Sequence, residues 1–288
     1  MEKTDIAIIG AGVVGLAVAY ALSNSGKDVF VIERNRSFGQ ETSSRNSEVI
    51  HSGIYYPPDS LKARTCIRGK SLLYEFCSKN NIPSKKLGKL VVAPTESSRG
   101  KIEEIYKNAN TCGVKNLKIL EKIDIKKLEP SVEAESAILS PDTGIIDSHA
   151  LMQCLFQGAK ARNVNFAFSV EAKGIEKEGS SYRITVKEPE GESFSFAAKT
   201  VINSAGLESD KVAELVGIDP DKHSYRIHYC KGDYFRIRSP KKFSIKHLVY
   251  PPPTETDLGI HLTPDLAGGL RLGPDAKYVK NIDYNIDE

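Results

Sequence analysis

The feature that most constrains this chain is a set of spaced glycines between residues 6 and 33. The apolar, β-branched run at residues 6–9 is typical of a buried parallel strand. Gly10 follows where the chain must turn tightly, Gly12 lets the backbone approach a pyrophosphate, and Gly15 lets the next helix pack close to the sheet. That helix would aim unpaired N–H groups and its positive dipole end at phosphates. The spacing therefore predicts a Rossmann-type unit for an adenine dinucleotide.

The residues that follow fit the spacing of the same unit. Ala19 and Leu22 continue the helical spacing, Gly26 suits a left-handed helix stop, and residues 28–32 are typical of a second strand. Glu33 then falls where an acidic side chain binds the ribose hydroxyls. Because a carboxylate there would repel a 2′-phosphate, the sequence disfavours NADP.

Composition narrows the function classes. The 288 residues suffice for one large or two medium domains, and the net charge of +3 does not call for nucleic acid. The five cysteines form no C-x-x-C pair, so we expect reduced thiols in a cytoplasmic protein and predict no metal site. No apolar stretch approaches the roughly 20 residues that span a bilayer. The early strand leaves no room for a signal peptide, and peripheral membrane contact stays compatible with the sequence.

Periodicity predicts the remaining elements. Helices are expected at 61–80, 102–112, from Ser148 to about 159, and in a short stretch ending at Gly217. Strands are expected at 87–93, 164–170, 182–187, 193–197, 200–206, 225–238, 247–250, 259–263 and 269–273. We therefore predict an α/β nucleotide-binding domain, residues 1–80 and 145–216, interleaved with an antiparallel-sheet substrate domain, residues 81–144 and 217–288.

NAD and FAD share the first crossover unit, so the next segment is needed to separate them. Residues 39–53 form a long polar loop after the acidic residue, and Thr42, Ser43 and Arg45 could complete a pyrophosphate cradle leading toward a flavin ring. On composition alone, a solvated loop that contains serine and arginine is an equally good interpretation.

Several further strings match a known family, and two of them, at 51–56 and 259–263, are much more specific than the glycine motif. The matching strings are residues 45–57, 60–64, 144–147, 231–235, 248–251, 258–263 and 273–274. With them the chain resembles the D-amino-acid-oxidase-like superfamily of FAD oxidoreductases, and within it the L-2-hydroxyglutarate dehydrogenase/oxidase group. The strings occur in family order over essentially the whole chain.

The resemblance implies FAD as the cofactor, with Val170 contacting adenine through its backbone and Ala205-Gly206 lying along the cofactor. The implied cofactor-binding residues are Gly10, Gly12, Val13, Val14, Gly15, Glu33, Arg34, Thr42, Ser43, Arg45, Asn46, Ser47, Val170, Ala205 and Gly206.

The resemblance also implies oxidation of a small 2-hydroxy acid, L-2-hydroxyglutarate above all, by hydride transfer to flavin N5. Electrons would pass to a quinone or to oxygen. We expect His261 to be the base and His51 a substrate contact, although the two roles could be exchanged, because the pKa of histidine lies near neutrality. Tyr250, Tyr55 and Tyr56 could donate hydrogen bonds to substrate oxygens. The other histidines (His149, His223, His228 and His247) are expected to be structural.

Relatives of this group continue beyond the stretch matched here by residues 273–275, with an arginine-containing loop and a glycine-rich turn that return to the flavin domain. The chain is therefore expected to be a fragment, a split gene product or a degraded member, with weakened flavin binding. Two other functions stay open: an amine or amino-acid oxidase of the same superfamily, and an inactive dinucleotide-binding protein.

Overall fold

The computed structural model describes residues 2–238, 245–253 and 259–286. Leu258, which belongs to one of the matched strings, and the last two residues of the predicted substrate domain lie outside these ranges. The chain divides into two compact units. The first unit contains residues 1–46 and 148–228, and the second unit contains residues 47–147 and 229–288.

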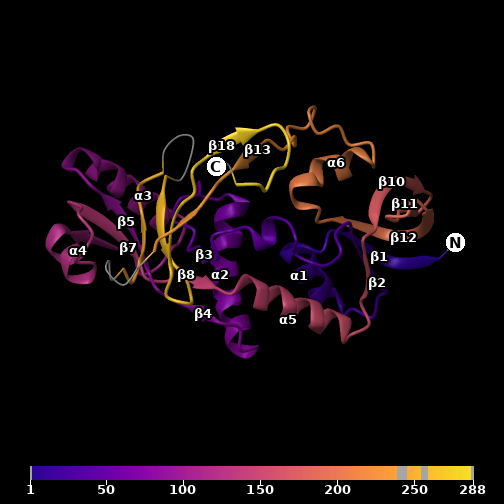
Figure 1. Ribbon diagram of the computed structural model, residues 1–288, viewed down its shortest axis with the longest axis horizontal. Coiled ribbons are helices and arrows are strands. Elements are labelled where there is room, and N and C mark those ends of the chain that lie inside the picture. Colours follow the sequence, from indigo (N-terminus) through magenta and orange to yellow (C-terminus); the bar gives the residue numbers. More distant parts are fainter. Residues whose placement is uncertain (1, 239–244, 254–258, 287–288) are drawn as a thin grey trace. The chain divides into compact units, whose positions relative to one another are not determined.

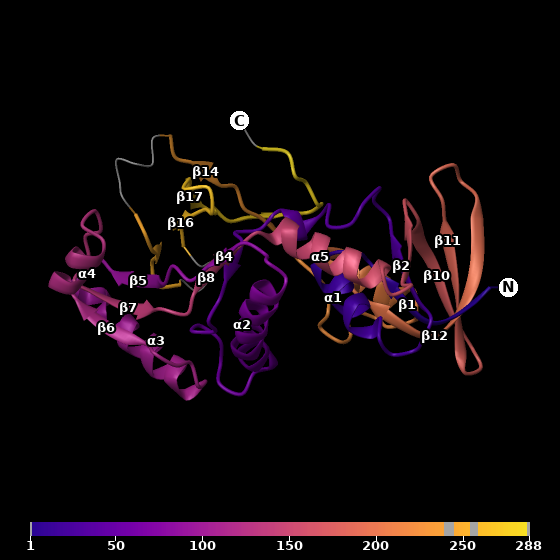
Figure 2. The same cartoon turned by 90° about the horizontal axis from the view of Figure 1, so that it is seen from below.

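The first unit is built on a six-stranded sheet in the order β10-β11-β12-β1-β2-β9. Its strands are β1 (Lys3–Ile9), β2 (Val29–Glu33), β9 (Asn165–Phe168), β10 (Glu171–Glu178), β11 (Ser181–Lys187) and β12 (Ser193–Asn203). The neighbours β12, β1, β2 and β9 run parallel, and β10, β11 and β12 run antiparallel. Helices α1 (Val13–Leu22) and α5 (Ser148–Lys160) pack side by side (Figures 1 and 2), and α6 (Ser209–Glu214) follows β12.

One long strand replaces two that the sequence predicted. Strands expected at 193–197 and 200–206 are a single element, β12, whose first half pairs antiparallel with β11 and whose second half pairs parallel with β1. Lys199 and Thr200 interrupt the apolar pattern, but both are exposed, and Lys199 Nζ pairs with Asp5 at 2.6 Å. The polar pair therefore marks a solvent-facing stretch of the strand and not its end.

The second unit contains a seven-stranded sheet in the order β14-β17-β16-β15-β5-β7-β6. Its strands are β5 (Lys89–Ala93), β6 (Lys118–Glu121), β7 (Ser136–Ser140), β14 (Phe235–Arg236), β15 (Leu248–Tyr250), β16 (His261–Pro264) and β17 (Leu270–Gly273). Smaller sheets pair β3 (Val49–Ile50) and β4 (Ser84–Lys85) with β8 (Gly144–Ile146), and β13 (Tyr229–Lys231) with β18 (Lys277–Val279).

The seven-stranded sheet is mixed, whereas the sequence predicted an antiparallel one. Strands β15 and β5 run parallel. The chain between them is long, so no hairpin sets their relative direction. Helix α3 (Arg99–Thr111) and helix α4 (Lys122–Leu128) cover opposite faces, because alternate side chains of β5 join different cores. Val91 packs in the core of α3, and Leu90 packs in the core of α4.

The predicted domain boundaries at residues 80, 144 and 216 differ from the observed ones at 46, 147 and 228. The reason lies in helix α2 (Leu61–Lys79), which was expected in the nucleotide domain. Its Lys70 pairs with Asp142 at 3.1 Å, and Ile67 packs against the core that contains Ile54. These contacts tie α2 to the second unit.

A buried carboxylate at the end of α4 gives a prediction about stability. The Glu129 side chain is 0% exposed, and its Oε1 accepts hydrogen bonds from Lys246 N, His247 N and His247 Nδ1 at 2.8, 2.7 and 2.6 Å. Glu129→Ala would leave those partly buried donors without this acceptor, so we expect a loss of roughly 3 kcal/mol in the free energy of unfolding. Urea denaturation measures it. The control Glu133→Ala removes an exposed carboxylate, and equal small losses for the two variants would refute the prediction.

Candidate functional site

The turn between β1 and α1 is shaped by two glycines that have no room for a side chain. Gly10 has a φ of +100°, and a Cβ there would lie 2.6 Å from Ser204 O. A Cβ on Gly15 would lie 1.9 Å from Gly10 O. Any larger residue would push the helix away from the turn or the turn away from β12. Gly12, the residue before α1, leaves its space open except for Ser43 Oγ, 3.0 Å from a Cβ built there.

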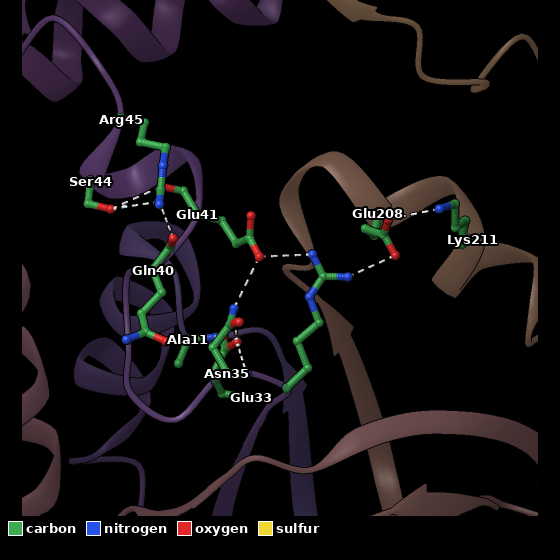
Figure 3. Close-up of polar contacts among 10 residues, drawn as sticks. Ala11, Glu33, Asn35, Gln40, Glu41, Ser44, Arg45, Glu208 and Lys211 are labelled. Carbon is green, nitrogen blue, oxygen red and sulfur yellow. Dashed lines mark hydrogen bonds and ion pairs between the residues drawn. The ribbon is translucent and has the colours of Figure 1, made fainter. Parts of the chain in front are cut away.

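Glu33 ends β2 and braces the same turn. Its Oε2 accepts a hydrogen bond from Ala11 N at 2.8 Å, and its Oε1 accepts one from Asn35 N at 2.8 Å (Figure 3). The side chain is only 7% exposed. The carboxylate is therefore held in one place at the carboxyl ends of the parallel strands, where nucleotides bind in folds of this kind.

The polar loop that follows β2 closes over the start of α1. Ser43 Oγ, on the short helix Thr42–Ser44, accepts a hydrogen bond from Val13 N at 2.9 Å. Arg34 pairs with Glu41 and Glu208, both at 3.0 Å, and so joins this loop to the segment after β12. Glu208 also pairs with Lys211 at 2.8 Å (Figure 3). These ion pairs connect the loop after β2 to the segment after β12.

A pocket of about 290 Å³ lies over this turn, entirely within the first unit. Most of the predicted cofactor-binding residues line it: Gly10, Gly12, Val13, Val14, Glu33, Arg34, Thr42, Ser43, Val170, Ala205 and Gly206. Val14 is 62% exposed although it is apolar. The pocket thus combines a helix N-terminus, a fixed carboxylate and an apolar wall.

Four predicted residues do not line this pocket. Gly15 lies under the turn and shapes it from below. The Arg45 guanidinium donates to Gln40 O within its own loop, and Asn46 Nδ2 donates to Ser43 O at 2.8 Å. Ser47 belongs to the second unit.

One side of the pocket was not predicted from the sequence. Further lining residues lie on β10 and on the segment from the end of β12 through α6: Ala172, Lys173, Leu207, Glu208, Lys211, Val212 and Leu215. The signal was present, because ligands in parallel sheets bind beyond the carboxyl ends of the strands and this segment directly follows β12. β10 is harder to find, since most of its side chains are polar and only Ile175 is buried.

A second group of candidate functional side chains lies in the second unit. We define the Lys89 cluster as His51, Tyr55, Lys89, Tyr250 and His261. Lys89 Nζ lies 3.4 Å from His51 Nδ1, 3.8 Å from the centre of the Tyr250 ring and 5.4 Å from that of Tyr55. The His261 ring stacks on Tyr250 with centroids 3.7 Å apart. Four of the five residues predicted for catalysis and substrate binding therefore come together, around a lysine that the sequence analysis did not consider.

Burial sets the protonation states in this cluster. Burial, reinforced by the charges of Lys89, His261 and Lys62, lowers the pKa of His51 to about 3, so His51 is neutral at neutral pH. Burial also lowers the pKa of Lys89 to about 7. Tyr55 and Tyr250 have pKa values raised mainly by burial, so both hydroxyls keep their protons.

Contacts of its backbone and of the next residue hold His51 in place. It follows β3 directly, and the Cys66 thiol of α2 donates to its carbonyl oxygen at 3.5 Å. The next side chain, Ser52, hydrogen-bonds with Ser140 at 2.7 Å and with Thr143 at 3.1 Å, all of them buried. Ser140 is the register partner of Lys89. The hydroxyl group therefore ties the His51 loop to the sheet that carries Lys89.

Tyr56 does not join the Lys89 cluster. Its ring lies under Lys62 Nζ at 4.9 Å, and burial raises the pKa of its hydroxyl. Its carbonyl oxygen accepts a bond from Asn108 Nδ2 at 2.9 Å. The structure thus gives the adjacent tyrosines different surroundings.

Comparisons with known proteins agree with the fold and the cofactor. The family model described as "DAO: FAD dependent oxidoreductase" matches residues 5–288. Mitochondrial L-2-hydroxyglutarate dehydrogenase of Arabidopsis thaliana is 38% identical over 98% of this chain and 64% of its own length. The Homo sapiens enzyme of that name is 36% identical over 94% of this chain and 60% of its own length. The chain thus spans less than two thirds of either dehydrogenase.

Solved structures give the same fold. L-alpha-glycerophosphate oxidase from Mycoplasma pneumoniae, with FAD bound, has a TM-score of 0.89 at 28% identity and covers 98% of this chain and 73% of its own. Glycine oxidase from Geobacillus kaustophilus has a TM-score of 0.84 at 18% identity, covering 100% of this chain and 75% of its own. At 18% identity, the match to glycine oxidase shows the fold alone. The predicted fold class and the predicted superfamily are confirmed.

The comparisons and the structure also bear on the predictions about membranes and cellular location. Within the part of the chain that the structure describes, no helix is long and apolar enough to cross a membrane. The dehydrogenase relatives are named as mitochondrial, so the expected cytoplasmic location stays a prediction without support from them. The family itself is clear, because its model covers nearly the whole sequence and the glycine turn is formed as expected. The chain belongs to the DAO family of FAD-dependent oxidoreductases, whose cofactor is FAD.

Proposed function

We propose that the first unit binds FAD and that the protein oxidises a small 2-hydroxy acid, L-2-hydroxyglutarate in particular, to the 2-oxo acid. The observation that carries the proposal is the pocket over the Gly10 turn. Its helix N-terminus suits the diphosphate, its fixed carboxylate suits the ribose, and its apolar wall suits the adenine. The identity of 38% to an L-2-hydroxyglutarate dehydrogenase supports the choice of substrate.

The residues present fit the adenosine diphosphate half of FAD. Val13 N donates to Ser43 Oγ, but the other first-turn N–H groups of α1 lack partners within the helix and suit the diphosphate. Glu33 is fixed by Ala11 and Asn35, where it can accept bonds from ribose hydroxyls. Val170, Ala172 and other apolar side chains of the pocket suit the adenine ring. When bound, FAD supplies a two-electron acceptor.

The Lys89 cluster supplies groups for a 2-hydroxy acid. In the proposed reaction His261 would take the hydroxyl proton while the C–O bond becomes a carbonyl, and bound FAD would supply the acceptor for the hydride of the α-carbon. Protonated Lys89 donates to Nδ1 of neutral His51, which places the single His51 proton on Nε2. That Nε2–H can donate to a substrate oxygen but cannot accept a proton. The arrangement therefore favours His51 as the substrate contact and His261 as the base.

The test is the absorbance of the FAD-loaded protein under anaerobic conditions. L-2-hydroxyglutarate should bleach the band of oxidised flavin and yield 2-oxoglutarate in equal amount. Glycine, sarcosine and D-amino acids should leave the band unchanged. Bleaching by an amino acid in place of the hydroxy acid would contradict the proposed substrate class, and a band unchanged by every compound would contradict the proposed oxidation.

A further inference from the structure

We propose that Lys89 binds a carboxylate of the acid substrate and is the principal cationic anchor of its site. The inference rests on the proposed function and adds to it, because neither the sequence pattern nor the family match assigns a role to this residue. The anchor would explain how a cluster of aromatic rings and imidazoles recognises an anion.

The first argument is the isolation of the charge. The Lys89 side chain is 1% exposed, and its only hydrogen-bond neighbour among the described residues is His51 Nδ1. No Asp or Glu of the described ranges pairs with Lys89, and none contributes to its pKa, which only the Cys66 thiol raises. A buried ammonium without a counter-charge is costly to fold. An anionic ligand would supply the missing charge.

The second argument is the position of Lys89 in its strand. Lys89, Val91 and Ala93 alternate along β5 and so share one face, and the other two are buried apolar side chains. A lysine in the first of these positions contradicts the apolar pattern of the strand. Places where a chain breaks such a local rule at a cost in stability are often functional sites.

The third argument is the chemistry around the ammonium. Tyr55 Oη is buried and has no hydrogen-bond partner among the described residues. Its hydroxyl, the Nε2–H of His51 and the Lys89 ammonium are all donors, and a carboxylate needs donors. The Tyr250 ring, 3.8 Å from Nζ, holds the cation in place without neutralising it. The cluster is thus complementary to an anion and not to a cation.

The experiment compares the FAD-loaded wild-type protein with Lys89→Met, which keeps an unbranched apolar chain without the charge. Anaerobic calorimetry on protein whose FAD has first been reduced with dithionite measures binding of L-2-hydroxyglutarate, L-malate and L-lactate without turnover. We expect Lys89→Met to weaken binding of every acid that the wild type binds by at least about tenfold. Lys101→Met, which removes an exposed lysine of α3, should bind like the wild type.

Stability gives a second, independent measurement. Without ligand, Lys89→Met should unfold at higher denaturant concentration than the wild type, because it removes the cost of a buried charge. The pKa of Lys89 is lower in the folded protein than in the unfolded chain, so the unfolded state binds more protons between about pH 7 and about pH 10.4. The unfolding free energy of the wild type therefore rises across this window, and the advantage of Lys89→Met shrinks. The groups facing Lys89 are His51, Tyr55, Cys66 and Tyr250.

The outcomes separate the inference from the proposed function. Loss of binding together with increased stability supports the anchor, whereas unchanged binding in Lys89→Met, or a wild type that binds no acid, overturns it. Lower stability of Lys89→Met would indicate a structural lysine and also overturns it. If the wild type binds L-malate or L-lactate but not L-2-hydroxyglutarate, and Lys89→Met loses that binding, the anchor stands and the proposed substrate fails.

Discussion

Gly15→Ala should weaken FAD binding by about one to two orders of magnitude. The added Cβ would lie 1.9 Å from the carbonyl oxygen of Gly10, and a backbone atom cannot rotate away as a side chain can. Helix α1 would have to move off the turn and take its first-turn N–H groups away from the diphosphate. Overpacking of this kind costs about 1–3 kcal/mol, so FAD affinity should fall by roughly 5- to 150-fold. Flavin occupancy of the purified protein and FAD titration measure the effect.

Gly69→Ala is the matched control. It makes the same chemical change inside helix α2, where a Cβ would meet nothing within 4 Å. Alanine favours a helix over glycine, so this variant should keep full occupancy and gain slightly in stability. If Gly15→Ala also keeps full occupancy, the close approach at the turn is not what positions the nucleotide.

His261→Ala should slow flavin reduction by roughly 10²–10⁴-fold while leaving flavin occupancy intact, the range expected for loss of a general base. His261 is 4% exposed and stacks on Tyr250, so the alanine variant also leaves a cavity. His261→Gln keeps more of the volume and should be equally slow. Anaerobic stopped-flow mixing with L-2-hydroxyglutarate measures the rate.

His149→Ala is the control for this prediction, because His149 is exposed in the first turn of α5. Its rate should equal that of the wild type. A fall in occupancy for both His261 variants would show that the residue supports the fold, and an unchanged rate would show that another group takes the proton.

The glycine turn was predictable from the sequence because its constraints are local. Gly10 and Gly15 are needed where backbone segments approach closely, and Glu33 is needed as an acceptor at the end of the second strand. All three constraints arise within one crossover unit, and the structure shows them as expected. The elements with strong apolar periodicity, such as α2 at Leu61–Lys79, were found nearly to the residue. Local pattern and final structure agree where one element decides its own conformation.

The sequence was less informative where distant segments meet. β12 was divided in two because Lys199 and Thr200 interrupt its pattern, and only the pairing with both β11 and β1 shows that it is continuous. β10 was missed because most of its side chains face water. Prediction from hydrophobic periodicity requires that one face of the element is buried along its whole length. In β10 and β12 that face is buried only in part.

Lys89 shows the same limit in the candidate site. In the sequence it is one of many lysines, and although it falls inside the strand predicted at 87–93, nothing there marks it as buried. Only the fold brings it to His51, Tyr55 and Tyr250. The loop from Thr42 to Ser47 gave a partial success, since Thr42 and Ser43 line the pocket while Ser47 belongs to the second unit.

The central claim is that the turn from Gly10 to Glu33 holds the adenosine diphosphate half of FAD. The most direct measurement is a flavin fluorescence titration of the protein stripped of cofactor, with FAD, with FMN, and with FAD in the presence of ADP or 2′-phosphorylated ADP. FAD should bind, FMN should not, ADP should compete, and the 2′-phosphate should weaken that competition because Glu33 repels it. Binding of FMN as tight as that of FAD, or FAD binding that ADP leaves unchanged, would contradict the claim.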